Sequence, residues 1–291
     1  MLKLEKMTLN ELKNLLKKYQ YQPQKRLGQN FLIDQRALKK VIKAANLKAT
    51  DLILEIGPGP GNLTIELAKK SQMVLAVEKD SFMVEILKGN LKKHQINNVK
   101  VIQEDILRLD PLKYKLKPQG YKIVANLPFY LTAPVIRKFL ETPYLPKELV
   151  LIIQKEVGQR ICSQPPRLNL LAISVQFYAQ PQIMAFLSKK SFWPIPEVDS
   201  ALIKITPQPS PHNSDLVFRQ QFFQLVKAGF QQPRKQILNN LAKGLNLKNK
   251  ETIKTWLLKH QIRPEQRAET LSLEDWLRLV KNFWQLKKNL L

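Results

Sequence analysis

The chain has few acidic residues and almost no cysteine, and each shortage narrows the possible classes of protein. Its 291 residues include 23 Asp and Glu against 48 Lys and Arg, which gives a net charge of +25. A surface this basic favours a polyanionic partner, either nucleic acid or an anionic membrane. The single cysteine, Cys162, excludes an internal disulfide and a multi-cysteine metal site. We therefore predict no metal and a reducing, cytoplasmic location.

Long apolar runs are also missing. No run reaches the ~18 apolar residues that a membrane span needs, and the first residues show no apolar core of the signal-peptide type. We expect no membrane partner. Apolar residues recur at helical spacing near the start, so residues 1–24 are predicted to form a basic helical extension. Positive charge gathers at the two ends, because residues 1–50 and 215–291 each carry a net charge of +9.

Short apolar runs alternate with helical patterns over the first two-thirds of the chain. This alternation is typical of an α/β domain whose parallel sheet is covered by helices on both faces. The predicted strands are residues 52–56, 73–77, 99–103, 122–125 and 149–153, and the predicted helices between them are 62–70, 81–92 and 132–141. A further strand at 200–205 follows a proline-rich loop and is predicted to lie at the edge of the sheet.

The composition changes near residue 207, where "PQPSPHNSD" has the proline and polar content of a linker. Beyond it the pattern is amphipathic and helical. The predicted helices are 216–230, 234–242, 251–259 and 273–286. We therefore predict a catalytic domain over residues 25–208 and a small all-helical domain over 209–291.

Three of only nine glycines stand together in "EIGPGPGNLT", between a predicted strand and a predicted helix. Gly57 begins a turn that lets the backbone approach a ligand closely. Glu78 ends the next strand, where a carboxylate can accept both hydroxyls of a ribose. The two prolines remove donors that a pyrophosphate needs, so S-adenosylmethionine suits this loop better than a dinucleotide does. Asp105 follows the third strand and is placed to accept from the amine of the cofactor's adenine.

The stretch "NLPFYL" (126–131) puts aromatic surface at the end of the fourth strand. The Asn126 side-chain carbonyl and the Leu127 backbone carbonyl offer two acceptors to an amine such as adenine N6. Pro128 stiffens the turn, and Phe129 can stack on a base, which contributes roughly 1–3 kcal/mol. Because both hydrogens of the amine are held, its lone pair is freed to attack a methyl group.

With these motifs, the chain resembles the ribosomal RNA adenine N6-dimethyltransferase family, specifically its KsgA type, which acts on small-subunit rRNA. The matching segments run from residue 25 to residue 276. They are "KRLGQNFLID" (25–34), "EIGPGPGNLT" (55–64), "VEKD" (77–80), "EDIL" (104–107), "NLPFYLTAPVI" (126–136), "QKEVGQRI" (154–161), "FWPIPEVDSALI" (192–203), "AGFQQPRKQILNNL" (228–241) and "RAETLSLEDW" (267–276). Phe129 stands where the family commonly has tyrosine, which keeps the stacking and loses a hydroxyl.

The resemblance implies a class I S-adenosylmethionine-dependent methyltransferase (Rossmann-like) domain followed by a small all-α domain. It implies S-adenosyl-L-methionine contacts at Asn30, Leu32, Gly57, Glu78, Asp105 and Asn126. It also implies dimethylation of two adjacent adenines in the 3′-terminal hairpin of small-subunit (16S) rRNA, late in assembly of the subunit. The helical C-terminal domain would bind RNA or the ribosome.

Four basic residues are the best candidates for phosphate contacts: Lys25, Arg26, Arg234 and Lys235. The predicted partner is small-subunit rRNA, either free or within a pre-30S particle, and the protein is expected to be a monomer. Two alternatives are a large-subunit rRNA adenine N6-methyltransferase of the macrolide-resistance type and a non-catalytic ribosome-assembly factor on the same fold. A nicotinamide oxidoreductase would need a different glycine spacing.

Overall fold

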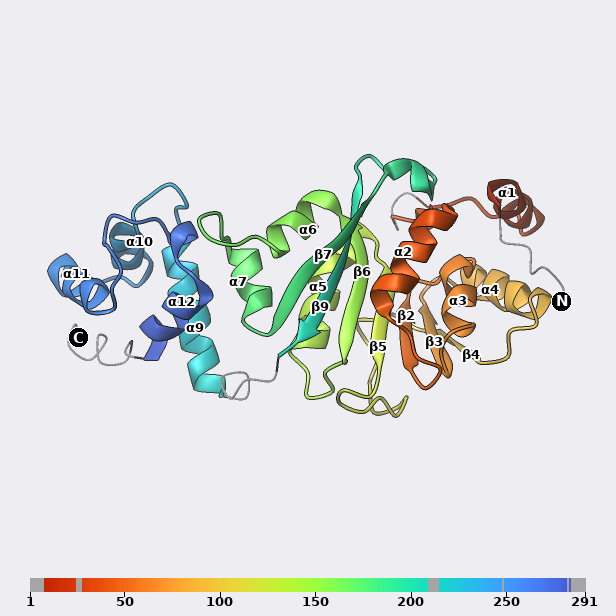
Figure 1. The fold of residues 1–291 in the computed structure, drawn as a ribbon, viewed down its shortest axis with the longest axis horizontal. Helices are drawn as coiled ribbons and strands as arrows, with labels where there is room; N and C mark the ends of the chain where they lie inside the picture. Colours follow the sequence, from red (N-terminus) through yellow and green to blue (C-terminus); the bar gives the residue numbers. More distant parts are fainter. Residues whose placement is uncertain (1–7, 25–27, 209–214, 248, 282, 284–291) are drawn as a thin grey trace. The chain divides into compact units, whose positions relative to one another are not determined.

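The computed structural model describes residues 8–24, 28–208, 215–247, 249–281 and 283, which form two compact units. The first unit comprises residues 1–159 and 181–207, and the second comprises 160–180 and 208–291 (Figure 1). Residues 160–180 thus group with the C-terminal helices, although the sequence division at residue 208 places them in the catalytic domain. The roles assigned to the two predicted domains stay predictions.

A seven-stranded sheet forms the core of the first unit, in the order β4-β3-β2-β5-β6-β9-β7. Five of these strands were predicted at nearly the same bounds. These five, which are neighbours in the order β4, β3, β2, β5 and β6, run parallel to one another. The strands are β2 (Leu52–Ile56), β3 (Met73–Glu78), β4 (Val99–Gln103), β5 (Lys122–Asn126), β6 (Glu148–Gln154), β7 (Ala179–Leu187) and β9 (Ser200–Pro207). The predicted α/β class is confirmed.

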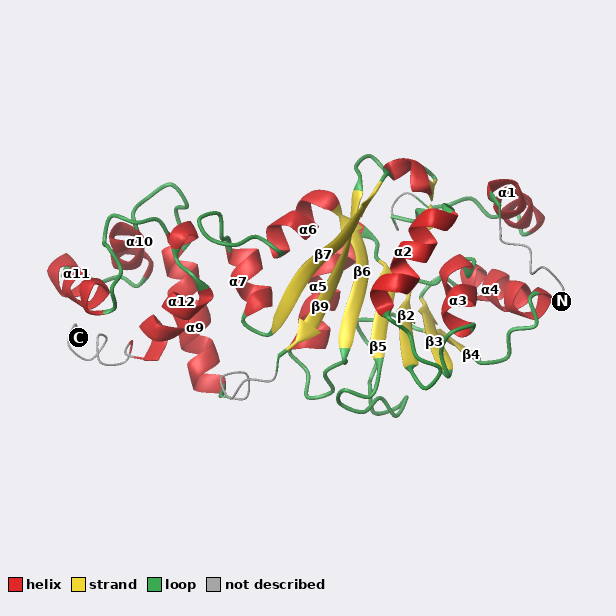
Figure 2. Ribbon diagram, viewed as in Figure 1, coloured by secondary structure: helices red, strands yellow, loops and turns green. Residues whose placement is uncertain are grey.

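Helices cover the sheet on both faces, as Figure 2 shows for the first unit. They are α2 (Gln35–Ala45), α3 (Asn62–Ala68), α4 (Ser81–Lys93), α5 (Thr132–Leu140) and α6 (Lys155–Ile161). α1 (Leu9–Lys18) lies away from the sheet and packs on α4. The apolar faces of α2 and α3 pack on Ile53, Val74 and Val124 of the sheet. The neighbouring residues on these strands point to the opposite face, and Leu54 and Ile123 are also fully buried there. The sheet therefore has no face open to water along its central strands.

The prediction that 200–205 forms an edge strand was wrong. β9 lies inside the sheet, antiparallel to β6, and β7 forms the edge beyond it. β7 contains Pro181 and alternates between exposed and half-buried residues. Both features are typical of an edge strand, because a proline cannot donate a ladder hydrogen bond. A short antiparallel pair, β1 (Phe31–Leu32) with β8 (Phe192–Trp193), forms a separate two-stranded sheet.

A buried lysine closes the amino end of the sheet. The Lys122 ammonium donates to the backbone oxygens of Ala45 and Asn46 at 2.9 Å each. It also lies 3.0 Å from carboxylate oxygens of Asp51 and Glu148. A buried charge is stable only when it is paired and hydrogen-bonded, and here both conditions hold. This network links the starts of β5 and β6 to the turn before β2.

The second unit contains helices α7 (Leu170–Gln176), α9 (Leu216–Gly229), α10 (Ile237–Gly244), α11 (Lys250–Lys259) and α12 (Leu273–Lys281). Trp276 of α12 is fully buried and its ring would overlap a side chain at Gly229 of α9. α10 begins three residues later than the predicted 234–242 because residues 231–236, which include Pro233, form a turn. No helix in the described part of the chain has the length and apolar content needed to cross a bilayer.

Candidate functional site

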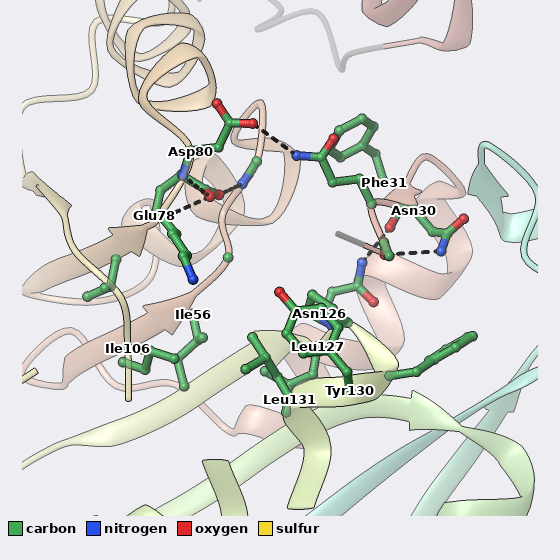
Figure 3. A pocket seen from close by; sticks show the side chains of 18 of the residues that line it. Asn30, Phe31, Ile56, Glu78, Asp80, Ile106, Asn126, Leu127, Tyr130 and Leu131 are labelled. Atoms are coloured by element: carbon green, nitrogen blue, oxygen red, sulfur yellow. Dashed lines mark hydrogen bonds between the residues drawn. The ribbon is translucent and has the colours of Figure 1, made fainter. Parts of the chain in front are cut away.

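A cavity of about 250 Å³ opens where the carboxyl ends of β2, β3 and β5 and the segment after β4 meet. Open α/β sheets bind ligands at this edge. Eight residues predicted from the sequence line it: Asn30, Gly57, Glu78, Asp105, Asn126, Leu127, Pro128 and Phe129. Figure 3 labels four of them, Asn30, Glu78, Asn126 and Leu127. The fold thus brings together residues that are up to 99 positions apart in the chain.

The glycine turn after β2 provides space above its backbone. Gly57 has φ of +66°, which favours glycine, and a Cβ placed there would have no atom within 4 Å. Gly59, with φ of +54°, lies against an aromatic ring, since its Cβ would come within 2.9 Å of Phe31. The turn is therefore covered on one side by Phe31 and open to the cavity at Gly57.

Three backbone donors hold the carboxylate of Glu78. The N–H of Gly59 donates to Oε2 at 3.2 Å, and the N–H groups of Lys79 and Asp80 donate to Oε1 at 2.8 and 3.0 Å. Burial raises the pKa of Glu78, and these donors offset part of the rise by favouring the charged form. The side chain is thus fixed in position, and Oε2, which accepts one of these bonds, has remaining acceptor capacity for a ligand hydroxyl.

Asp105 has a partner that the sequence analysis did not identify. The Lys79 ammonium lies 2.9 Å from its Oδ2 and lowers the pKa of Asp105. The same contact raises the pKa of Lys79. A ligand amine that binds Asp105 therefore meets a charged carboxylate that already accepts one hydrogen bond on each oxygen, from Lys79 and from the Leu107 N–H.

The end of β5 presents the amide of Asn126 to the cavity. Its Nδ2 donates to the backbone oxygen of Asn30 at 2.7 Å, which leaves Oδ1 as an acceptor. Leu127 is anchored through its N–H to Ile152 in β6 at 3.1 Å. Pro128 then begins a short 3₁₀ turn over Phe129–Leu131, which places the half-buried Phe129 ring on the cavity wall.

The remaining predicted residues lie away from this cavity or outside the described residues. Leu32 is only 4% exposed and does not line the cavity, and its backbone oxygen accepts from Asn62 at 2.9 Å. Arg234 and Lys235 are exposed on the turn between α9 and α10. Lys25 and Arg26 lie outside the residues that the structure describes.

The sequence analysis missed several residues of the cavity wall, three of which matter for its shape. Gln29, Phe31 and Asp80 all line the cavity. Gln29 and Phe31 stand within "KRLGQNFLID" and Asp80 ends "VEKD", so the quoted motifs contained them. Nothing in the spacing of those motifs indicated that the two segments would lie against each other.

Glu55 is a buried residue of β2, and it directly precedes Ile56, which lines the cavity. Its side chain is 1% exposed, and Oε2 has no hydrogen-bond partner among the described residues. Burial and, to a smaller extent, the nearby charge of Glu78 raise its pKa to about 8, against the lowering effect of Thr64. At neutral pH this carboxyl is therefore mostly protonated in the folded protein and ionised in the unfolded chain.

The Glu55→Gln variant is expected to change how stability depends on pH. Because the folded-state pKa is raised, the stabilising proton is fully present below pH 4.5 and is lost as the pH rises through about 8. Glutamine resembles the protonated form, so we expect the melting temperature of the variant relative to wild type to be roughly 6–12 °C higher at pH 8.5 than at pH 5.5, which corresponds to about 3 kcal/mol. Thermal unfolding at pH 5.5 and 8.5 provides the measurement. An equal change at both pH values would contradict this assignment.

Comparison with known proteins gives the same family along almost the whole chain. The model of the ribosomal RNA adenine dimethylase family matches residues 21–285. A ribosomal RNA small subunit methyltransferase A from Dehalococcoides mccartyi is 40% identical over 273 residues, which cover 94% of this chain and 92% of that protein.

Solved structures share the fold. A dimethyladenosine transferase from Plasmodium falciparum superposes with a TM-score of 0.72 at 25% identity, covering 88% of this chain and 98% of that one. The 23S rRNA methyltransferase ErmE gives a TM-score of 0.70 at 23% identity, covering 87% and 98%. The resemblance and the Rossmann-like fold inferred from the motifs are confirmed, and the chain belongs to the ribosomal RNA adenine dimethylase family.

Proposed function

We propose that this protein dimethylates N6 of two adjacent adenines in the 3′-terminal hairpin of small-subunit rRNA, with S-adenosylmethionine as the methyl donor. The observation that carries the proposal is the 2.7 Å hydrogen bond from Asn126 Nδ2 to Asn30, within a family of rRNA adenine dimethylases. This bond turns the amide so that Oδ1 remains available to accept from an adenine amine.

The residues around the cavity suit S-adenosylmethionine. Glu78 is held where it can accept ribose hydroxyls, and charged Asp105 can accept from the adenine of the cofactor. The open space at Gly57 lets the ligand approach the backbone, and the turn has no requirement for a phosphate. When bound, S-adenosylmethionine supplies an electrophilic methyl group on a sulfonium.

The chain's own residues prepare the adenine for attack. Asn126 Oδ1 and the Leu127 carbonyl accept the two N6 hydrogens, which draws the nitrogen toward tetrahedral geometry and frees its lone pair. Phe129 stacks on the base, while Phe192 lines the cavity from the two-stranded sheet at 2% exposure. The N6 nitrogen gains the methyl carbon as the carbon–sulfur bond breaks, and the N6 proton passes to water. No strong general base is needed.

The substrate must present an unstacked adenine. Enzymes that act on a base remove it from the stack, and proteins recognise RNA largely through shape and unpaired segments. Within this proposal the protein acts as a monomer in the cytoplasm, where small subunits assemble, and its substrate is the rRNA of a pre-30S particle. The helical second unit, with exposed Arg234 and Lys235, contributes phosphate contacts.

The substrate assignment can be tested by mapping transferred methyl groups. The protein is incubated with labelled S-adenosylmethionine and with under-methylated 30S and 50S particles in separate reactions. We expect label on the two adjacent adenines of the 30S particle, two methyl groups on each. Label on 50S alone would favour the large-subunit type of methylase, and label on neither, despite cofactor binding, would favour a non-catalytic assembly factor.

The Asn126→Ala variant is expected to reduce methyl transfer by about 10²–10³-fold, as loss of one positioned polar contact does in other enzymes. Binding of RNA should stay within about 2-fold of wild type, because the removed amide contacts the flipped base and the Asn30 backbone and is not one of the proposed phosphate contacts. Single-turnover transfer and filter binding measure the two effects. Exposed Asn97 offers a matched control as Asn97→Ala. Turnover equal to wild type in Asn126→Ala would reject the assigned role.

Removing the positive charges of Arg234 and Lys235, which are exposed before α10, should weaken RNA binding and make that binding less dependent on salt. The double variant Arg234→Gln, Lys235→Gln is expected to reduce the magnitude of the slope of log K against log salt by about 1–2. Fewer phosphate contacts form in the variant, so RNA binding releases fewer counterions. Its control is Lys115→Gln, Lys117→Gln, which removes the same charge from an exposed loop before β5, at the edge of the sheet opposite the cavity. Equal slopes in the two variants would exclude the assigned contacts.

A further inference from the structure

The N-terminal helix α1 is built to dock on the first unit, although it precedes every segment that carries the family resemblance. A capping box defines its start, where Thr8 Oγ1 accepts from the Glu11 N–H at 3.2 Å and Glu11 Oε2 accepts from the Thr8 N–H at 2.7 Å. One face of the helix is apolar, and Leu12 and Leu16 on it are 0% and 2% exposed. A helix with such a face is held by packing, not by propensity alone.

The apolar face of α1 packs against Phe31, a residue that lines the cavity. Leu12 and Leu16 form one cluster with Phe31 and with Met83 and Ile86 of α4. Phe31 lines the cavity on its other side, where its ring covers the turn at Gly59. The packing of α1 therefore bears directly on the position of the segment that contains Phe31.

Tyr21 joins two walls of the cavity at one point. Its hydroxyl lies 2.6 Å from Asp80 Oδ2 and 2.8 Å from Gln29 Oε1. Gln29 also reaches Asp80 directly, through Nε2 at 3.4 Å from Oδ2 (Figure 3). Asp80 belongs to the wall formed after β3, whereas Gln29 belongs to the wall formed by residues 28–32. The hydroxyl has one proton, which it donates to Asp80, and Gln29 Nε2 donates to the same carboxylate oxygen. Tyr21 and Gln29 thus both meet Asp80, from which the chain separates them by 59 and 51 residues.

Each of these walls carries a residue of the proposed cofactor site. The N–H of Asp80 donates to Glu78, which is proposed to bind the ribose. The residue after Gln29 is Asn30, whose backbone oxygen accepts from Asn126. Movement at the Tyr21 contact would therefore displace Glu78 and Asn30, two of the residues assigned to the cofactor.

The protonation state of Tyr21 suits a permanent donor. Burial, followed by the hydrogen bond to Asp80, raises the pKa of Tyr21 well above its ordinary value. The phenol stays neutral through the physiological range, and its one proton is best donated to the charged carboxylate. Hydrogen bonds to charged groups are roughly twice as strong as neutral ones.

We infer that Tyr21 is a positioning residue and that α1 acts through it as a brace, which holds residues 28–32 against Asp80 so that the cofactor cavity is formed before the ligand enters. The inference rests on the proposed function, because it assigns the cavity to S-adenosylmethionine. A preformed site avoids the ordering cost that a mobile wall would add to binding. The effect is therefore on cofactor affinity, with little effect on the chemical step.

A purely structural role for α1 makes a different prediction. In that case the loss of a contact would lower the melting temperature, and the molecules that remain folded would bind the cofactor with unchanged affinity. Cofactor affinity, measured well below the melting temperature, separates the two roles.

The test compares Tyr21→Phe with Tyr19→Phe by calorimetric titration of S-adenosylmethionine and of S-adenosylhomocysteine. Phenylalanine keeps the ring in the apolar cluster and removes only the hydroxyl. We expect the Kd for both ligands to rise about 10-fold in Tyr21→Phe, the effect of losing a hydrogen bond to a charged group. Turnover at saturating cofactor should stay within about 2-fold. Tyr19 is the matched control, since its hydroxyl makes no hydrogen bond among the described residues and lies near Gly89 of α4.

A second variant tests the brace without touching the hydroxyl. Leu12→Ala loosens α1 from the cluster it shares with Phe31, and it too should weaken cofactor binding while turnover at saturation is retained. An unchanged Kd in Tyr21→Phe, whatever its melting temperature, would overturn the inference. Failure of the wild-type protein to bind S-adenosylmethionine would instead overturn the proposed function, so the two failures are distinguishable.

Discussion

The hydrogen bond between Asn126 and the backbone of Asn30 is the contact on which the site depends. It joins the end of a central strand to a segment that precedes the sheet in the chain, and it thereby closes the cavity between them. It also fixes the orientation of the Asn126 amide, because Nδ2 donates to Asn30 and Oδ1 is left as the acceptor for a ligand. The parallel strands beneath it supply the constraint that makes this possible, since their carboxyl ends meet at one edge.

The amino and carboxyl ends of the parallel strands are stabilised in opposite ways. At the amino edge, the Lys122 ammonium is surrounded by two backbone oxygens and two carboxylates, so its capacity for hydrogen bonds is used within the fold. At the carboxyl edge, Glu78 and Asp105 keep acceptor capacity for a ligand. The first arrangement holds the strand starts in register, and the second leaves the polar groups that recognition requires.

Much of the first unit could be predicted from the sequence, because buried parallel strands are continuous apolar runs and the ligand residues follow them directly. β2 to β6 and seven cavity residues were found in this way, whereas Asn30 was implied by the family resemblance. β7 was missed because its polar, proline-containing alternation does not resemble a buried strand. α2 was also not predicted, although the sequence has a clear helical pattern from Asp34 onward. The contacts of Tyr21 and Lys79 depend on long-range packing, which periodicity does not encode.

Glu55 gives the cavity a further property through its unused proton. A methyl donor of this kind carries net positive charge, whereas the demethylated product is electrically neutral overall. A cation bound nearby favours the ionised form of such a buried carboxyl, because an opposite charge lowers its pKa. After transfer that electrostatic attraction disappears with the charge.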